Sequence, residues 1–192
     1  MAARDKTDQT RQKIIQATDD LLYHKGFNLM SFSDIAEASD VPRGNIYYYF
    51  KTKDEVLTAV IQYRISQMKN MLDEWNKTIP GPLERLKRYT RIPLNEMHDV
   101  IQYGCPIGTL NSELGKVQRE LQIESKQPLT IFKRWIKKQF NELIPNADAE
   151  SLTTHFLVRT QGLAMIAYIY KDEKIIQNEV KALNQWLDQL AS

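Results

Sequence analysis

Apolar residues recur at intervals of three and four along most of the chain, which is the spacing of one face of an α-helix. No segment shows the apolar and polar alternation, with paired turn signals, that is typical of a β-hairpin. The pattern predicts an all-α protein of about nine helices, with an N-terminal three-helix lobe and a C-terminal helical lobe. The expected helices cover residues 9–25, 31–39, 42–49, 53–77, 82–101, 106–115, 117–143, 148–170 and 173–190.

Local signals in the first 52 residues set the helix boundaries there. Gly26 follows the first helix at the position where a left-handed residue is favourable. Ser31 and Asp34 form a capping box that opens the second helix, and Pro42 is suited to the first position of the third. We therefore expect a helix-turn-helix domain at residues 1–52 and a second domain at residues 53–192.

The composition is that of a globular chain. Its 192 residues include 42% hydrophobic residues, with 26 basic and 24 acidic side chains, which excludes disordered and low-complexity proteins. The single cysteine, Cys105, has no partner for an internal disulfide, and the first residues have no signal-peptide pattern. The longest apolar run, 162–170, is about half of the roughly 20 residues that a membrane-spanning helix needs. We expect a cytoplasmic protein without a membrane partner.

Two short helices joined by a tight turn and preceded by a longer helix are typical of a helix-turn-helix, whose second helix enters the DNA major groove. Arg43 can donate two hydrogen bonds to guanine and Asn45 can pair with adenine, while Gly44 permits close approach of the backbone. Tyrosine hydroxyls and a lysine suit phosphate oxygens, and two serines would lie at the opposite edge of the groove. The predicted DNA contacts are Ser31, Ser33, Arg43, Gly44, Asn45, Tyr47, Tyr48, Tyr49 and Lys53.

The stretch from Phe32 to Leu57 resembles the TetR/AcrR family of bacterial transcriptional repressors. The similarity lies in Asp-Ile-Ala at 34–36, in Gly-x-x-Tyr-x-x-Phe at 44–50 and in Lys-x-Lys-Asp at 51–54. The resemblance implies the same DNA contacts apart from Ser33, together with C-terminal helices that bind an inducer and dimerise. A dimer would place two recognition helices on a palindromic operator. Two positions depart from the family pattern. Pro42 replaces a common serine, and Asp40 replaces a usual glycine, which predicts weaker operator binding.

Charge adds little to this interpretation. Residues 1–53 hold eight basic and seven acidic side chains, a net charge of +1, whereas a strongly basic lobe is the usual footprint of nucleic-acid binding. We therefore expect a local basic face, with Arg4, Lys6 and Arg11 beside the recognition helix. Tyr47 and Phe50 are helical neighbours, and core packing is the alternative explanation for both.

The last two predicted helices carry apolar residues at alternating intervals of three and four, a heptad-like seam. The first of them becomes apolar on all sides after Gly162, which favours a four-helix homodimer interface. Ordinary packing within one chain is the alternative. The predicted interface residues are Leu152, Leu163, Ile166, Tyr170, Ile176, Val180, Leu183 and Leu187.

An inducer cavity would draw on aromatic residues, a methionine and a few polar groups of the C-terminal lobe. Arg159 could pair with an anionic ligand or with an acidic partner across the dimer interface. Cys105 lies at the start of a predicted helix, where the backbone amides favour the reactive thiolate form. One hypothesis is therefore that Cys105 senses thiol-reactive inducers. The alternative is that Cys105 is a small buried residue of the core. The candidate ligand residues are Tyr103, Cys105, Trp135, His155, Phe156, Arg159, Gln161, Met165 and Tyr168.

No catalytic motif is found, and His98 with Cys105 is too small a set for a metal site, so we expect neither an enzyme nor a cofactor or metal. The leading hypothesis is a dimeric DNA-binding repressor that a small-molecule or thiol-reactive inducer releases. The alternatives are a helical ligand-binding or interaction protein without DNA binding and, less well supported, a thiol redox protein. The operator sequence, the inducer and the direction of regulation do not follow from the sequence.

Overall fold

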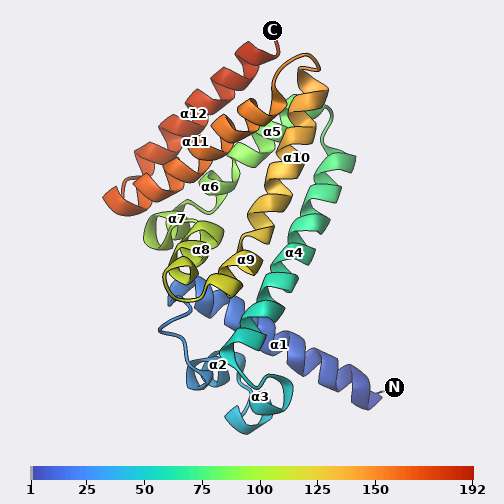
Figure 1. Ribbon diagram of the computed structural model, residues 1–192, viewed down its shortest axis with the longest axis vertical. Coiled ribbons are helices and arrows are strands. Elements are labelled where there is room, and N and C mark those ends of the chain that lie inside the picture. The colour runs from blue at the N-terminus through green and yellow to red at the C-terminus, as the bar shows by residue number, and fades with distance from the viewer. Residues whose placement is uncertain (1) are drawn as a thin grey trace. The chain divides into compact units, whose positions relative to one another are not determined.

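The computed structural model describes residues 2–192, and it describes their side chains except at residues 2–6 and 117. The regular elements of this part of the chain are all helices, which confirms the all-α prediction (Figure 1). They are α1 (Ala2–His24), α2 (Phe32–Ser39), α3 (Arg43–Tyr49), α4 (Lys53–Thr78), α5 (Pro82–Thr90), α6 (Ile92–Asn95), α7 (Met97–Tyr103), α8 (Pro106–Val117), α9 (Arg119–Ser125), α10 (Gln127–Leu143), α11 (Ala149–Tyr170) and α12 (Glu173–Leu190).

Most helix boundaries agree with the sequence prediction to within two residues, but two predicted helices are divided. The helix expected at 82–101 is broken at Arg91 and Glu96 into α5, α6 and α7, and Pro93 lies in the first turn of α6. The helix expected at 117–143 is broken at Lys126, two residues before Pro128. Proline has no N–H for the helical ladder, which explains why a helix is interrupted beside each of these residues.

The chain divides into two packing units. Unit 1 comprises the residues up to Gln67 together with Leu110–Gln127, and unit 2 comprises Met68–Thr109 and Pro128–Ser192. Both α4 and α8 therefore contribute to each unit. This division by packing differs from the expected boundary at residue 52, because the first half of α4 belongs to unit 1. The assignment of functions to 1–52 and 53–192 stays a prediction.

Unit 1 is built around α1, α2, α3 and the start of α4, and α1 packs against α2, which packs against α3 (Figure 1). Gly26, just past the end of α1, has a φ of 81° and ends that helix as predicted. The unit has an apolar core of buried side chains. Its members are Ile14, Ile15, Leu22, Phe27, Met30, Ile35, Val41, Ile46, Phe50, Val56, Leu57, Val60, Ile61, Ile65, Leu110 and Leu114.

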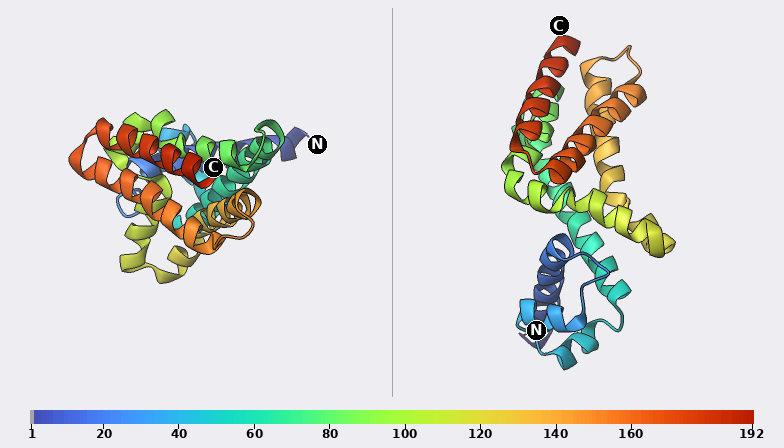
Figure 2. Two further views of the ribbon diagram at one scale, coloured as in Figure 1. Left: turned by 90° about the horizontal axis from the view of Figure 1, so that it is seen from above. Right: turned by 90° about the vertical axis from the view of Figure 1, so that its left-hand side faces the viewer.

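Unit 2 has a core rich in aromatic residues. In this unit α11 packs against α7 and α12, and α12 packs against α5 (Figure 2). The core residues Tyr89, Phe132, Phe140 and Phe156 form a chain of ring contacts, with centroids 5.0 to 5.8 Å apart. Such edge-to-face and tilted pairs add to the stability gained by burying the rings. They fix the position of the helices that surround the cavity described below.

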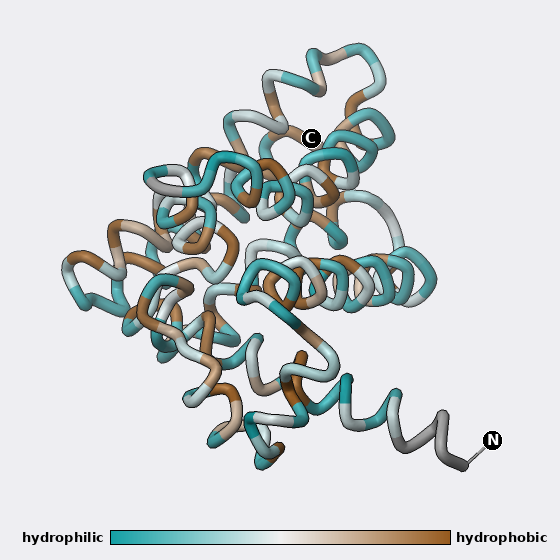
Figure 3. Tube along the Cα trace, turned by 60° about the horizontal axis from the view of Figure 1, so that its bottom comes forward, coloured by the Kyte–Doolittle hydropathy of each residue, from teal (hydrophilic) through white to brown (hydrophobic). Residues whose placement is uncertain are grey.

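Hydrophobic and hydrophilic positions alternate along the helices rather than forming long uniform runs (Figure 3). This is the pattern of amphipathic helices that bury one face. Among the described residues, no helix combines the length and the apolar character required to span a membrane.

Candidate nucleic-acid interface

A capping box fixes the start of α2, as the sequence predicts. The Asp34 N–H donates to Ser31 Oγ over 3.2 Å, and the Ser31 N–H donates to the Asp34 carboxylate over 2.7 Å. Lys25 Nζ lies 2.7 Å from Asp34 Oδ1. The Lys25 ammonium and the hydrogen bonds from Ser31 lower the pKa of Asp34 to about 2. The carboxylate therefore remains charged at neutral pH and caps the positive end of α2.

Asp40 closes α2 in the left-handed conformation, with φ 49° and ψ 41°. Aspartate is one of the few residues besides glycine that adopt this conformation readily, which explains how Asp40 replaces the expected glycine. Its side chain is 97% exposed and lies 3.4 Å from Lys13 Nζ, a surface ion pair that contributes little stability. The weaker operator binding expected from Asp40 stays a prediction.

Helix α3 exposes most of its side chains, and Ile46 is the only buried residue among those it contains. Gly44 and Asn45 are exposed, and a Cβ atom added at Gly44 would meet nothing within 4 Å. Ile46, 0% exposed, attaches the helix to the core of unit 1. A helix held by one apolar side chain leaves its other faces free for a partner.

Arg43 joins predicted DNA contacts from two helices. Its guanidinium donates to Ser33 Oγ of α2 over 3.3 Å and to the Tyr47 hydroxyl over 3.1 Å. The guanidinium carbon lies 5.7 Å from the centroid of the Tyr47 ring. A guanidinium has five N–H donors, so these two bonds leave donors for a base edge. The three side chains thus form one exposed polar cluster across α2 and α3.

The aromatic residues of α3 differ in burial. Tyr47 is 37% exposed and packs on Phe32 with ring centroids 4.8 Å apart, while Phe50 is 2% exposed and belongs to the core. Tyr48 is 73% exposed and contacts Tyr49, which is half-buried, edge-to-face. Core packing therefore explains Phe50, and Tyr48 is the most exposed aromatic residue of this surface.

Lys53 has partners within the protein. Its ammonium donates to the Phe27 carbonyl over 2.7 Å and to the Asn28 carbonyl over 3.4 Å. The N–H groups of the same two residues donate to the carboxylate of Glu113, over 3.0 and 2.7 Å. Lys53 and Glu113 together hold the segment between α1 and α2. Sequence reasoning missed Glu113, because it is distant in the chain and forms no local pattern with this segment.

Arg11 of α1 places a positive charge beside the end of α3. Its guanidinium carbon lies 5.1 Å from the centroid of the Phe50 ring, and the side chain is exposed. This position agrees with the expectation that Arg11 flanks the recognition helix. Arg4 and Lys6 were expected there as well, and they lie outside the described side chains.

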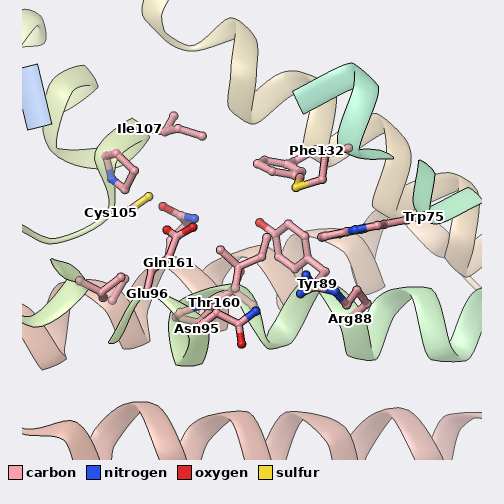
Figure 4. A pocket seen from close by; sticks show the side chains of 16 residues that line it. Trp75, Arg88, Tyr89, Asn95, Glu96, Cys105, Ile107, Phe132, Thr160 and Gln161 are labelled. Carbon is pink, nitrogen blue, oxygen red and sulfur yellow. The ribbon is translucent and has the colours of Figure 1, made fainter. Parts of the chain in front are cut away.

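Unit 2 contains a cavity of about 270 Å³. Figure 4 shows Cys105 and Glu96 toward one end, Trp75 and Arg88 toward the other, and Tyr89, Thr160 and Gln161 between them. Cys105 and Gln161 are the predicted ligand residues that line the cavity. The lining residues are Met71, Trp75, Arg88, Tyr89, Ile92, Pro93, Asn95, Glu96, Val100, Cys105, Pro106, Ile107, Phe132, Thr160, Gln161 and Ala164.

The other predicted ligand residues do not line this cavity. Phe156 is completely buried in the core, and Trp135 donates to Asn76 Oδ1 over 3.0 Å. Arg159 forms an ion pair with Glu179 of the same chain, at 2.5 Å, whereas the sequence analysis considered an anionic ligand or an acidic partner across the dimer interface. The remaining predictions are Tyr103, which is half-buried, and His155, Met165 and Tyr168, which are exposed.

Several polar residues of the cavity were missed because they lie on helices whose convergence the sequence does not reveal. The guanidinium of Arg88 lies over the Trp75 ring, 4.7 Å from its centroid, and its Nη1 atom is buried without a hydrogen-bond partner. Burial raises the pKa of the Tyr89 hydroxyl well above its usual range. Burial, followed by the nearby Asp99 carboxylate, also raises the pKa of Glu96.

Gly104 sets the corner between α7 and α8 that places Cys105 at the cavity. Its φ of 81° and ψ of −164° fall in a region that is essentially restricted to glycine. A Cβ atom there would lie 2.8 Å from Thr109 Cγ2. Cys105 follows as a half-buried thiol whose sulfur accepts from the Gly108 N–H over 3.5 Å.

The predicted dimer seam lies largely in the core of unit 2. Leu163, Ile176, Val180, Leu183 and Leu187 are at most 3% exposed within the single chain, so their side chains have almost no area left for a partner. The alternating spacing therefore reflects packing within the chain at these positions, which corrects the interface prediction for them.

Helix α11 has a second apolar face that is exposed. Ile166 and Tyr170 of the predicted interface are 42% and 71% exposed, whereas Leu152 is half-buried. Exposed apolar residues on the same helix extend this surface, which we call the α11 face. Its members are Val158, Met165, Ile166, Tyr168, Ile169 and Tyr170.

Comparisons with known proteins agree with this geometry. The family model described as "Bacterial regulatory proteins, tetR family" matches residues 14–60, which include α2 and α3. An uncharacterised HTH-type transcriptional regulator in the lacX 3′ region of Lactococcus lactis subsp. lactis is 26% identical over 91% of each chain. The HTH-type transcriptional repressor DhaR of Mycobacterium sp. (strain GP1) is 25% identical over 66% of this chain and 62% of its own.

A solved structure supports the fold over nearly the whole length. The TetR-family transcriptional regulator from Cytophaga hutchinsonii matches with a TM-score of 0.82, at 21% sequence identity, over 96% of each chain. The family match, the relatives and the fold lead to one conclusion: residues 14–60 carry the helix-turn-helix domain of the TetR family, and over most of its length the chain is similar to DNA-binding transcriptional regulators.

Proposed function

We propose that this chain is a homodimeric repressor that binds a palindromic operator through α2 and α3. The observation that carries the proposal is the exposed cluster of Arg43, Ser33 and Tyr47, with Asn45 and Tyr48 exposed on the same short helix. These side chains have the donors and acceptors that read base edges and hold phosphates. The name of the relative DhaR supports repression rather than activation.

The α11 face supports the homodimer. Isolated apolar side chains are common on protein surfaces, but several on one helix are typical of an interaction site. A second copy that covers this face with its own α11 would form the helix pair of a two-fold dimer. Such a dimer gives the protein two copies of α3, which a palindrome with half-sites about 34 Å apart requires. A regulator of bacterial genes acts in the cytoplasm, where the operator is.

The cavity of unit 2 supports release by a small molecule. It is enclosed mainly by apolar and aromatic side chains with a few polar groups, as small-molecule sites are. A ligand releases the operator if it binds more tightly to a dimer conformation that does not fit DNA than to the conformation that does. The loss of DNA affinity is set by the difference between these two ligand affinities. Cys105 lines the cavity as a half-buried thiol. An inducer that reacts with this thiol is therefore a second version of the proposal.

Selection of bound fragments from random duplex DNA tests the proposal. We expect enrichment of an inverted repeat, bound with two chains per site as measured by sedimentation of the complex. Recovery of random sequences, or binding by a single chain to an unrepeated site, contradicts it. A separate comparison of the chain and Cys105→Ser after alkylation tests the thiol form, because loss of DNA binding in both proteins excludes Cys105 as the sensor.

A further inference from the structure

We propose that the cavity of unit 2 binds a small monoanionic carboxylate with an apolar or aromatic body, and that Arg88 is its anchor. This inference shares one premise with the proposed function, namely that unit 2 binds a small molecule. The cavity, of about 270 Å³, is just below the usual range of roughly 300–1,000 Å³ for small-molecule sites, so its ligand is small.

Arg88 is the basic residue of α5 that has no ion-pair partner among the described residues. Arg85 lies 3.6 Å from Glu142, and Lys87 lies 2.5 Å from Asp188. The Nη1 atom of Arg88, in contrast, is buried without any hydrogen-bond acceptor. A guanidinium is charged at every physiological pH, and a buried charged donor without an acceptor is costly. An anionic ligand would remove this cost.

The apolar part of the ligand is indicated by the walls of the cavity. Trp75, Tyr89 and Phe132 contribute aromatic rings, and Ile92, Val100 and Ile107 contribute aliphatic side chains. The Trp75 ring also lies against the Arg88 guanidinium, which limits the orientations that the cation can take. A small apolar group can therefore lie in the cavity against these rings while its charged end meets Arg88, and Figure 4 shows Trp75, Tyr89 and Phe132 on the same side of the cavity as Arg88.

The charge of the ligand is indicated by what else lines the cavity. Glu96 is the one carboxyl group among the described lining residues, and burial and Asp99 both raise its pKa. A raised pKa favours the neutral form of a carboxyl group, which makes Glu96 a weaker anchor for a cationic ligand than an ordinary carboxylate. A single unpartnered Arg88 nitrogen suits a monoanion better than the dianion of a phosphate ester.

Isothermal titration of the full chain with three matched compounds tests the ligand class. The compounds are 3-phenylpropionate, its neutral amide 3-phenylpropanamide and its cationic analogue 3-phenylpropylamine. We expect the carboxylate to bind about tenfold or more tightly than the amide, because charge-assisted hydrogen bonds are about twice as strong as neutral ones. Equal binding of the amide, tighter binding of the amine, or binding of none at millimolar concentration overturns the proposal.

Two variants assign the anchor. Arg88→Gln keeps hydrogen-bonding capacity but removes the charge, and we expect it to bind acid and amide with equal affinity. Arg91→Gln, which changes an exposed arginine outside the cavity lining, should keep the wild-type preference. A preference that survives in Arg88→Gln overturns the assignment, provided that circular dichroism shows both variants folded. The comparison of acid with amide in the unmodified chain does not depend on either variant.

The same titrations repeated with operator DNA separate this inference from the proposed function. Carboxylate binding that leaves the DNA complex intact supports the ligand class and contradicts release by the ligand. Release of DNA by neutral compounds, without any binding of carboxylates, supports the repressor and overturns the ligand class.

Discussion

The two units of this chain use aromatic and charged side chains in opposite ways. In unit 1, Arg43 and Tyr48 are exposed on α3, a helix attached by one buried isoleucine. In unit 2, Tyr89 and Phe156 are buried, and Arg88 has a buried nitrogen at the cavity. The proposed DNA contacts are therefore local to one short helix, whereas the proposed ligand site depends on several helices that converge.

We therefore expect core substitutions in unit 2 to change stability without changing DNA recognition, and substitutions on the surface of α3 to change DNA recognition. The largest effect is expected for Phe156→Ala. Phe156 is fully buried and contacts the rings of Tyr89, Phe140 and Trp186. Its loss should lower the free energy of unfolding by about 3–5 kcal/mol, measured by urea denaturation, with no change in the preferred DNA sequence of the folded protein.

Ser151→Ala is the matched control for that prediction. Ser151 lies on the same helix, is exposed and is not part of the α11 face, so we expect a change within about 0.5 kcal/mol. Similar losses in the two variants would contradict the assignment of Phe156 to the core.

A smaller effect is expected at the corner beside the cavity. Gly104→Ala places a Cβ atom in a glycine-restricted conformation and against Thr109, which should destabilise the chain by about 1–3 kcal/mol. Gly162→Ala is the control, because Gly162 lies inside α11 with open space around it and should stabilise the chain by about 0.5–1 kcal/mol. Thermal unfolding of both variants measures the two effects, and equal signs would contradict this explanation of Gly104.

The capping box of unit 1 predicts a modest dependence of stability on pH. The pKa of Asp34 is about 2 in the folded chain and 3.8 ordinarily, so its contribution is complete above pH 3.8 and is lost as pH falls toward 2. The difference in thermal midpoint between the chain and Asp34→Asn should therefore shrink over that interval. Lys25→Gln removes the largest cause of the lowered pKa and should weaken this dependence. A constant difference from pH 6 to pH 2 would contradict the lowered pKa.

The sequence predicted the helices well where the signal is local. The Ser31–Asp34 box, Gly26 and Pro42 each act on neighbouring backbone groups, and the helices begin or end beside them. The interruptions near Pro93 and Pro128 could also have been inferred, since proline inside a helical pattern usually ends a helix. The apolar periodicity continues across both prolines, and for that reason each region was predicted as one uninterrupted helix.

The candidate sites were predictable to different degrees for the same reason. The exposure of most α3 side chains could be predicted because these residues are adjacent in the sequence, and their contacts with DNA stay a prediction. The cavity was found only at Cys105 and Gln161, because the faces of α5, α7, α10 and α11 that meet there are set by tertiary packing. The spacing of Ile176 and Leu183 fits contact with a partner helix as well as packing within the chain. Both side chains are fully buried within the single chain, which shows that they belong to its core.

We propose that α3 presents Arg43 to bases and not merely to phosphates. The most direct measurement is the affinity of Arg43→Ala for the selected operator and for every single-base variant of it, with Arg91→Ala as an exposed arginine control in unit 2. We expect Arg43→Ala to lose about 1–3 kcal/mol of its preference for the correct base at one position in each half-site, and to keep its preferences at the other positions. A uniform loss at all positions, or the same loss in the Arg91 control, would contradict the account.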